Sequence, residues 1–326
     1  MKLLKLVPDD TNIKFLKFRA PFYIISLLLM AASWGLVMTK GLNYGVDFAG
    51  GQEIRATFVG EETAPIPDLR QTLTAIQGVG DPVVQRFGAP NEVSIRVKLP
   101  PEAEGDKEFA DRLTRDITDA LKEGHPDVRI DGVDSVSGKV SGEFREKAIY
   151  ALLAAMLAIA IYIWIRFEWQ FGVGALFALV HDVSLTLGMF ALFQMEFSLQ
   201  IIAAILAIIG YSLNDTIVVY DRIRENLKKF RKMPLPELLD LSVNETLART
   251  VMTSLTLFVA LLPLLLFGPA SLFGLVAAIT LGLFVGTYSS VYMAAPILIW
   301  LGVNSDSFVP QETAAEKQEK VARGET

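Results

Sequence analysis

Asp215 is the residue of this sequence best placed to do chemistry, because it is a carboxylic acid inside an apolar run. Residues 201–209 before it are almost wholly apolar, and residues 217–219 after it resume that character. An ionisable side chain is costly in a membrane-spanning helix, so it usually faces a bundle interior or a wet cavity and serves an ion or proton pathway. We therefore interpret Asp215 as a candidate proton-binding residue.

Polar side chains in three apolar runs have spacings that would let them meet inside one bundle, since residues three or four apart share a helix face. The predicted proton-relay residues are Asp215, Arg249, Asn214, Ser212, His181, Asp182 and Thr253. A carboxyl group that moves between an apolar site and a site beside a guanidinium binds and releases a proton. The sequence thus predicts a two-state bundle in which Asp215 alternates between a protonated form without a partner and an ionised form paired with Arg249.

These polar residues also have structural interpretations. Asp215 lies near the end of its predicted helix and could be interfacial, and Arg249 could extend its charged end to the membrane surface. The adjacent His181 and Asp182 could form a hydrogen-bonded contact between helices. These alternatives stay open at the level of the sequence.

Two other classes of protein would use the same residues differently. An intramembrane aspartyl protease would place Asp182 and Asp215 on neighbouring helices as a dyad that shares one proton. Neither aspartate has the Gly-x-Gly-Asp context of such enzymes, and a dyad would need neither Arg249 nor a large external domain, so we predict that the chain is not an enzyme. A non-transducing scaffold would use the buried polar groups only to hold helices together.

The composition indicates a polytopic membrane protein with one polar domain, since 52% of the 326 residues are hydrophobic and 20% are charged. The absence of cysteine excludes disulfides and thiolate metal sites. No His, Cys or Asp spacing resembles a metal site, and we expect no cofactor beyond a coupling ion. The net charge of -6 is uneven, with short basic clusters beside the apolar runs. This distribution bears on membrane topology and gives no indication of nucleic-acid binding.

Six apolar runs of spanning length predict a membrane α-helical bundle of six transmembrane helices. The predicted spans are residues 21–39, 148–165, 171–193, 197–219, 247–267 and 272–301. The positive-inside rule puts the N-terminus 1–20, the basic loop 220–246 and the tail 302–326 in the cytoplasm, and the polar tail is predicted to be disordered. Small residues recur every fourth position from Gly274 to Ala294, which predicts close packing against another helix.

Residues 40–147 differ from the rest, because they are charged and rich in turns. Their patterns follow the order βαββαβ, which predicts an extracytoplasmic α+β ferredoxin-like domain between the first and second transmembrane helices. Many unrelated functions share this unit, so it indicates fold alone. At its entry Gly41, Gly45, Gly50 and Gly51 are hinge candidates, because glycine accepts unusual backbone angles. A tight turn that sets the domain on the membrane is an equal alternative.

Five motifs occur in a specific order along the chain. They are Gly-Leu-Asn-Tyr-Gly-Val-Asp-Phe-Ala-Gly-Gly at 41–51, Arg-Phe-Glu-Trp at 166–169, Ala-Leu-Val-His-Asp-Val at 178–183, Gly-Tyr-Ser-Leu-Asn-Asp to Arg-Ile-Arg-Glu-Asn at 210–226, and Ala-Arg-Thr-Val-Met-Thr-Ser-Leu-Thr at 248–256. Together they resemble the SecF members of the SecD/SecF family of protein-export membrane proteins, in the resistance-nodulation-division superfamily. The resemblance covers about residues 20–301. The chain departs from the family pattern at Leu257, often Thr, and at Tyr220, often Ser.

The resemblance implies half of a bundle that lies in the lipid bilayer of the bacterial inner membrane and pairs with SecD. It implies that the pair assists the Sec translocon, SecYEG with YajC, in drawing unfolded preproteins across the membrane with the proton gradient. It also implies that Asp215 is the proton site and Arg249 its partner. A carboxylate with Asn and Ser neighbours would suit a sodium ion as well as a proton.

Overall fold

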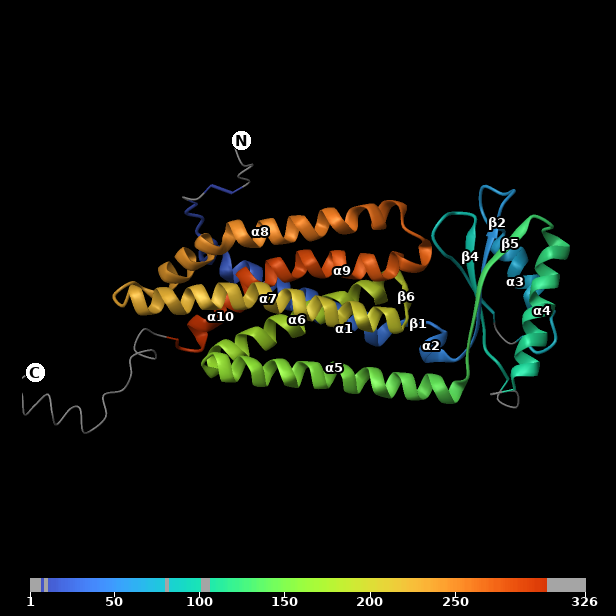
Figure 1. The fold of residues 1–326 in the computed structure, drawn as a ribbon, viewed down its shortest axis with the longest axis horizontal. Coiled ribbons are helices and arrows are strands. Elements are labelled where there is room, and N and C mark those ends of the chain that lie inside the picture. The colour runs from blue at the N-terminus through green and yellow to red at the C-terminus, as the bar shows by residue number, and fades with distance from the viewer. Residues whose placement is uncertain (1–6, 9–10, 80–81, 101–105, 304–326) are drawn as a thin grey trace, which may run out of the picture.

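The structure, a computed structural model, describes residues 7–8, 11–79, 82–100 and 106–303. In this part of the chain six helical segments are long and apolar enough to cross a membrane. They are η1 with α1 (Phe15–Phe18 and Arg19–Thr39), α5 (Gly138–Arg166), α6 (Trp169–Phe193), α7 (Leu199–Lys229), α8 (Leu235–Phe267), and the sixth segment formed by α9 (Ala270–Ser289), the π turn η3 (Ser290–Ala294) and α10 (Ala295–Trp300). Figure 1 shows these helices as one elongated bundle with a β sheet beyond one end.

Several helices extend beyond the predicted spans. α5 begins at Gly138, where the hydroxyl of Ser137 accepts a hydrogen bond from the N–H of Val140 at 3.4 Å. The segment 220–246, predicted as a loop, is helical except at residues 230–234. The apolar pattern marks only the thickness of the membrane, whereas these helices continue as polar, amphipathic ends beyond it. The tail predicted to be disordered lies, from residue 304 on, outside the described residues.

A four-stranded antiparallel sheet lies between α1 and α5 in the chain, with the strand order β3-β4-β2-β5. The elements are β2 (Gly51–Phe58), α3 (Ile66–Thr74), β3 (Val83–Arg86), β4 (Glu92–Val97), α4 (Lys107–Gly124) and β5 (Val128–Val136). Because side chains alternate along a strand, Ile54 and Phe58 pack into a core with α3 and α4. Glu53 and Arg55 then lie on the opposite face of the sheet.

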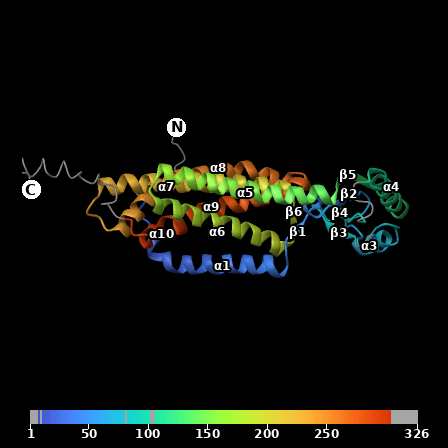
Figure 2. The same cartoon turned by 90° about the horizontal axis from the view of Figure 1, so that it is seen from below.

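Two short elements tie the chain between α1 and the sheet to the bundle. β1 (Asn43–Tyr44) pairs in parallel with β6 (Glu196–Phe197), which lies between α6 and α7. The short helix α2 (Val46–Ala49) then leads into the sheet. Figure 2 shows β1 and β6 at the junction between the bundle and the sheet, with α1 along one side of the bundle.

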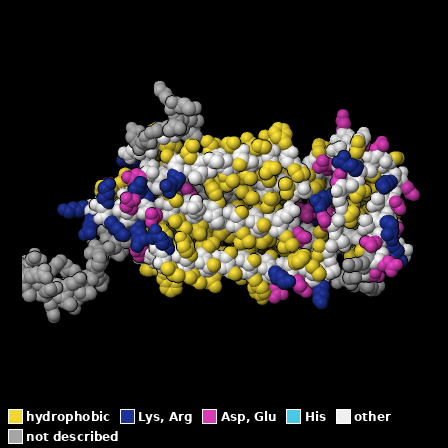
Figure 3. All heavy atoms as spheres, viewed as in Figure 1, with side chains coloured by type: hydrophobic (Ala, Val, Ile, Leu, Met, Phe, Trp, Pro, Cys, Tyr) yellow, Lys and Arg dark blue, Asp and Glu magenta, His cyan; other side chains and the backbone are white. Residues whose placement is uncertain are grey.

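The outer surface of the bundle fits an apolar solvent. Figure 3 shows hydrophobic side chains over the middle of the bundle, with Lys, Arg, Asp and Glu gathered towards the two ends. Large apolar side chains are exposed on α1, α5 and α8, among them Leu28, Leu157 and Val259. Since such a surface would be unfavourable in water, the chain is a multi-pass membrane protein.

The stripe of small residues in the sixth span packs against α7, as its spacing predicted. A Cβ atom on Gly282 would collide with the side chain of Ile208, and one on Gly286 would lie 3.0 Å from Cβ of Ser212. Glycine therefore allows the two backbones to approach closely. This contact places α9 and η3 beside the helix that carries Asp215.

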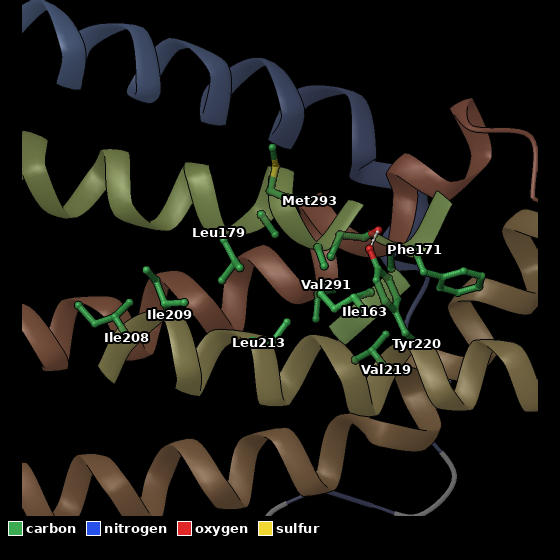
Figure 4. Packing of buried hydrophobic residues seen from close by; sticks show 14 of the residues in the cluster. Ile163, Phe171, Leu179, Ile208, Ile209, Leu213, Val219, Tyr220, Val291 and Met293 are labelled. Carbon is green, nitrogen blue, oxygen red and sulfur yellow. Dashed lines mark hydrogen bonds between the residues drawn. The ribbon is translucent and has the colours of Figure 1, made fainter. Parts of the chain in front are cut away.

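The π turn η3 is held in place by two tyrosines. Tyr23 of α1 donates a hydrogen bond to the carbonyl of Met293 at 2.7 Å, and Tyr220 of α7 donates one to the carbonyl of Ala294 at 2.9 Å. Figure 4 shows Tyr220 packed near Phe171 and Val219 in the apolar core of the bundle. Room for its hydroxyl comes from Gly174, where a Cβ atom would overlap it. Tyr220, where the chain departs from the family pattern, thus helps to hold the π turn in place.

Candidate functional site

Asp215 lies inside the bundle and joins three spans. Its side chain belongs to α7, and the residue is 6% exposed. Oδ1 accepts a hydrogen bond from Thr250 Oγ1 of α8 at 2.6 Å, and Oδ2 accepts one from Ser290 Oγ of η3 at 2.5 Å. Burial among these helices disfavours the interfacial interpretation. Hydroxyl groups can donate to an ionised carboxylate and accept from a protonated one, so this site suits a carboxyl group that changes its protonation state.

Asp182 forms a second buried site next to the first. This residue of α6 is fully buried. Its Oδ2 accepts hydrogen bonds from Ser212 at 2.5 Å and from Ser289 at 2.9 Å. Its Oδ1 lies 2.9 Å from Nδ1 of the equally buried His181. Within the described part of the chain, Nε2 of His181 has no hydrogen-bond partner.

The two carboxylates are linked through neighbouring residues on two helices. Ser212, which contacts Asp182, lies one helical turn before Asp215 on α7. Ser289 and Ser290 are consecutive, yet the first donates to Asp182 and the second to Asp215. The structure therefore assembles α6, α7, α8 and η3 around one polar centre in an otherwise apolar core.

The structure brings together only part of the predicted relay. Ser212, His181, Asp182 and Asp215 belong to the polar centre described above. Arg249, Thr253 and Asn214 are exposed on the outside of this chain. The hydroxyl of Thr253 bonds within α8, to the carbonyl of Arg249 at 3.0 Å. Pairing between Asp215 and Arg249 thus stays a prediction for another conformation or for an assembled complex.

Sequence reasoning gave Thr250, Ser289 and Ser290 no role at the polar centre. Thr250 directly follows the charged Arg249, and helix geometry turns these adjacent residues to different faces. In the sequence Ser290 belongs to the small-residue stripe, which predicts a packing position. The signal that could have found both serines is the Ser-Ser pair itself, two consecutive hydroxyls within the apolar run 272–301.

The segment that leads into the sheet contacts the helix that carries Asp215. Asp47 of α2 accepts a hydrogen bond from the N–H of Leu199, the first residue of α7, at 2.8 Å. A carboxylate at a helix N-terminus satisfies a free N–H and complements the helix dipole. The sequence predicts a role for the glycines of the motif 41–51, whereas in the structure Asp47 of this motif contacts α7.

The glycines of this entry have local structural reasons. Gly51 has a φ of +108°, and a Cβ atom there would collide with the carbonyl of Val97. A Cβ atom on Gly45 would lie 2.5 Å from Oε1 of Glu196. These contacts support the tight-turn interpretation, and a hinge stays a prediction.

A charged cluster fills the junction between the sheet and the bundle. Arg96 donates to the carbonyl of Tyr44 at 2.5 Å and to Oδ1 of Asn43 at 2.6 Å. Burial, and secondly the negative charge of Glu53, raise the pKa of Glu196 from its ordinary 4.5 to about 7, against the lowering effect of Arg96. A cavity of about 500 Å³ lies beside this cluster. The junction therefore contains a carboxyl group that titrates near neutral pH.

Comparison with known proteins places this architecture in a family. The family described as "Protein export membrane protein SecD/SecF, C-terminal" matches residues 116–304, and the "SecD/SecF GG Motif" matches residues 35–59. Protein translocase subunit SecF of Cereibacter sphaeroides is 44% identical over 92% of this chain and 93% of its own length. The SecF protein of Vibrio alginolyticus is 36% identical over 97% of this chain and 98% of its own length.

Solved structures agree with these sequence matches. A crystal structure of SecDF from Thermus thermophilus, described as a translocon-associated membrane protein, is 35% identical over 90% of this chain, with a TM-score of 0.80. A crystal structure of SecDF in a super-membrane-facing form is 34% identical over 99% of this chain, with a TM-score of 0.65. This chain spans 39% and 41% of those two longer chains. The chain belongs to the SecF family of protein translocase subunits.

Proposed function

We propose that this subunit uses the proton-motive force to help complete the export of preproteins. The observation that carries the proposal is the buried carboxylate of Asp215, which accepts hydrogen bonds from hydroxyl groups of two neighbouring spans. An isolated charge is costly at such a site, so the protonated and ionised forms favour different helix packings. Among the described residues no salt bridge to Asp215 offsets that cost in this conformation.

The membrane potential is large enough to bias such a bundle. It supplies about 2.3 kcal/mol per elementary charge per 100 mV. Proton entry to Asp215 from one side and release to the other would then alternate the two packings. We propose a proton as the coupling ion and no other cofactor. A sodium ion is the alternative, which would appear as a requirement for sodium at constant proton gradient.

We propose that SecD covers the exposed polar face of α7 and α8. Asn214, Arg249 and Thr253 lie on this face, although they belong to spans. Polar and charged side chains inside a membrane usually face protein or water rather than lipid. In the assembled pair, Arg249 would come within reach of a carboxylate. The SecDF relatives support a second bundle of this kind, and one of them is described as translocon-associated. As further partners we propose the SecYEG translocon, YajC and an unfolded preprotein.

We further propose that the sheet and its two helices form a ferredoxin-like domain outside the inner membrane. The order βαββαβ and the antiparallel pairing support this assignment. The basic residues Arg166, Arg222 and Arg224 lie at the opposite end of the bundle, which supports cytoplasmic termini. Movement of the domain would carry the change in helix packing to the preprotein.

The two rival classes fit less well. A protease dyad needs two carboxylates that share a proton, whereas Asp182 and Asp215 each accept hydrogen bonds from their own pair of hydroxyls. A scaffold needs no ionisable group at the polar centre. We therefore propose a transducing subunit that is not an enzyme.

The test is Asp215→Asn in the assembled export complex. This change keeps the size of the side chain and removes its titration. Asp221→Asn is the matched control, because Asp221 lies on the same helix but is exposed and contacts Arg166 at 3.2 Å. We expect Asp215→Asn to abolish the stimulation of export by the proton gradient and Asp221→Asn to preserve it. Unchanged stimulation in an assembled Asp215→Asn complex would refute the proposed function.

A further inference from the structure

Ser289 and Ser290, two hydroxyl residues of the polar centre, each have a second acceptor within reach. Ser290 Oγ lies 2.5 Å from Asp215 Oδ2 and 3.0 Å from the carbonyl of Thr287. Ser289 Oγ lies 2.9 Å from Asp182 Oδ2 and 3.2 Å from the carbonyl of Gly286. A hydroxyl group has one proton to donate. Each serine can therefore donate to the carboxylate or to the backbone, but not fully to both.

The protonation state of each carboxyl group decides between these two acceptors. An ionised carboxylate only accepts hydrogen bonds, so the serine donates to it. A protonated carboxyl group has a proton of its own to donate to the serine oxygen, and the serine proton is then free to turn to the backbone carbonyl. No covalent bond of the serine changes in this exchange, and the only proton added is the one that the carboxyl group binds.

The backbone around the two serines is unusual in a way that suits this exchange. Ser290 begins the π turn η3, and Ser289 ends α9. π turns are rare within helices and frequently occur at functional sites. The far end of the turn is fixed, because Tyr23 and Tyr220 bind the carbonyls of Met293 and Ala294. The serine end is thus the part of the turn that contacts the carboxyl groups.

We propose that Ser289 and Ser290 are positioning residues that connect the protonation of Asp182 and Asp215 to the backbone of the sixth span. Protonation of either carboxyl group turns its serine from the carboxylate towards the carbonyl one turn earlier on α9. Because the serines are adjacent, a change at one carboxyl group alters the π turn at the other. The proposal rests on the proposed role of Asp215 and adds the path by which its protonation reaches a neighbouring helix.

The test is the pH profile of gradient-driven export by the full complex in proteoliposomes. Ser290→Ala removes a donor to the ionised form of Asp215, so we expect the midpoint of the profile to move by about one pH unit in the alkaline direction. Ser289→Ala should give a shift of the same sign through Asp182. Ser290→Thr keeps a hydroxyl on Cβ and should restore the profile towards that of the unmodified protein.

Ser26→Ala is the matched control, because Ser26 is fully buried and its hydroxyl contacts the phenol of Tyr288 rather than a carboxylate. We expect it to leave the midpoint unchanged. The proposal is overturned if Ser290→Ala leaves the midpoint in place, or if Ser26→Ala moves it equally. If Ser290→Ala does not assemble, Ser290→Cys, with only a weak donor, must give the alkaline shift. Asp215→Asn distinguishes a failure of the proposed function from a failure of this inference. If Asp215→Asn abolishes the gradient dependence but Ser290→Ala leaves the pH profile in place, only the role of the serines is refuted.

Discussion

The carboxylate of Asp47 accepts a hydrogen bond from the backbone N–H of Leu199 at 2.8 Å. A residue of the domain entry thus closes the first turn of α7, the helix that carries Asp215. The same region pairs β1 with β6 immediately before α7. A displacement of α2 would therefore disturb the start of α7.

Replacement of Asp47 by Ala should destabilise the start of α7. Loss of a capping side chain costs roughly 1 kcal/mol, within a range of about 0.5–2 kcal/mol. Amide hydrogen exchange over the first turn of α7 measures the effect, and we expect it to be about fivefold faster in this variant. The exposed Asp68, in the first turn of α3, provides a control. Equal exchange in α7 of both variants would contradict the capping role.

The β1–β6 junction should weaken as the pH rises through about 7. The pKa of Glu196 is raised to about 7 by burial and by Glu53, so the protonated form is the one that the junction favours. The stabilisation is complete below the ordinary value of 4.5 and is lost as the pH rises through the folded-state value. Glu196→Gln, which stays neutral, should remove this dependence.

Hydrogen exchange of residues 43–44 and 196–197 between pH 5 and pH 9, corrected for intrinsic exchange, measures the stability of this junction. We expect protection to fall across neutral pH in the unmodified protein and to stay level in Glu196→Gln. The same decline in both proteins would show that another group titrates there.

Gly51 and Gly41 should respond differently to replacement by Ala. Both have positive φ angles, but the space around Gly41 is open, whereas a Cβ atom on Gly51 collides with the carbonyl of Val97. Gly41→Ala should lower the free energy of unfolding only by the cost of a left-handed backbone conformation at alanine, about 1–2 kcal/mol. Gly51→Ala should lower the free energy of unfolding by more than this, and should reduce the thermal stability of the sheet and its two helices further. Equal stabilities would speak against tight packing and favour the hinge prediction.

Replacement of Thr250, the neighbour of Arg249, should slow export. Its hydroxyl donates to Asp215 inside the bundle, whereas that of the exposed Thr256 donates to the carbonyl of Met252 within α8. A hydrogen bond to a charged group contributes about 1.5–3 kcal/mol. Thr250→Val should therefore slow gradient-driven export roughly tenfold, and Thr256→Val should leave it unchanged. Equal export rates in the two variants would remove Thr250 from the polar centre.

The sequence predicted the elements of the fold well, because membrane spans and half-buried strands leave strong periodic signals. The apolar runs located six spans, and the small-residue stripe predicted close packing against another helix, which the structure shows to be α7 at Gly282 and Gly286. Helix ends were harder to locate. Beyond the membrane α7 continues to Lys229 as a polar helix, which hydropathy alone interprets as a loop.

The polar centre was only partly predictable, since its members come from four separate segments. The unusual residue types His181, Asp182 and Asp215 were visible as polar groups in apolar runs. Ser289, Ser290 and Thr250 were not, because hydroxyl residues are common in spans and only their tertiary contacts distinguish them. Arg249 was equally visible as a charge in an apolar run, yet it is exposed and lies outside the polar centre.

Infrared absorption of protonated carboxyl groups, followed as the pH changes in the reconstituted complex, tests the central claim most directly. In the unmodified complex and in Asp221→Asn, we predict a carboxylic-acid band that disappears as the pH becomes alkaline. In Asp215→Asn, we predict that this band is missing from the difference between the acidic and alkaline spectra. An identical titrating band in all three complexes would show that Asp215 does not exchange a proton and would contradict the account.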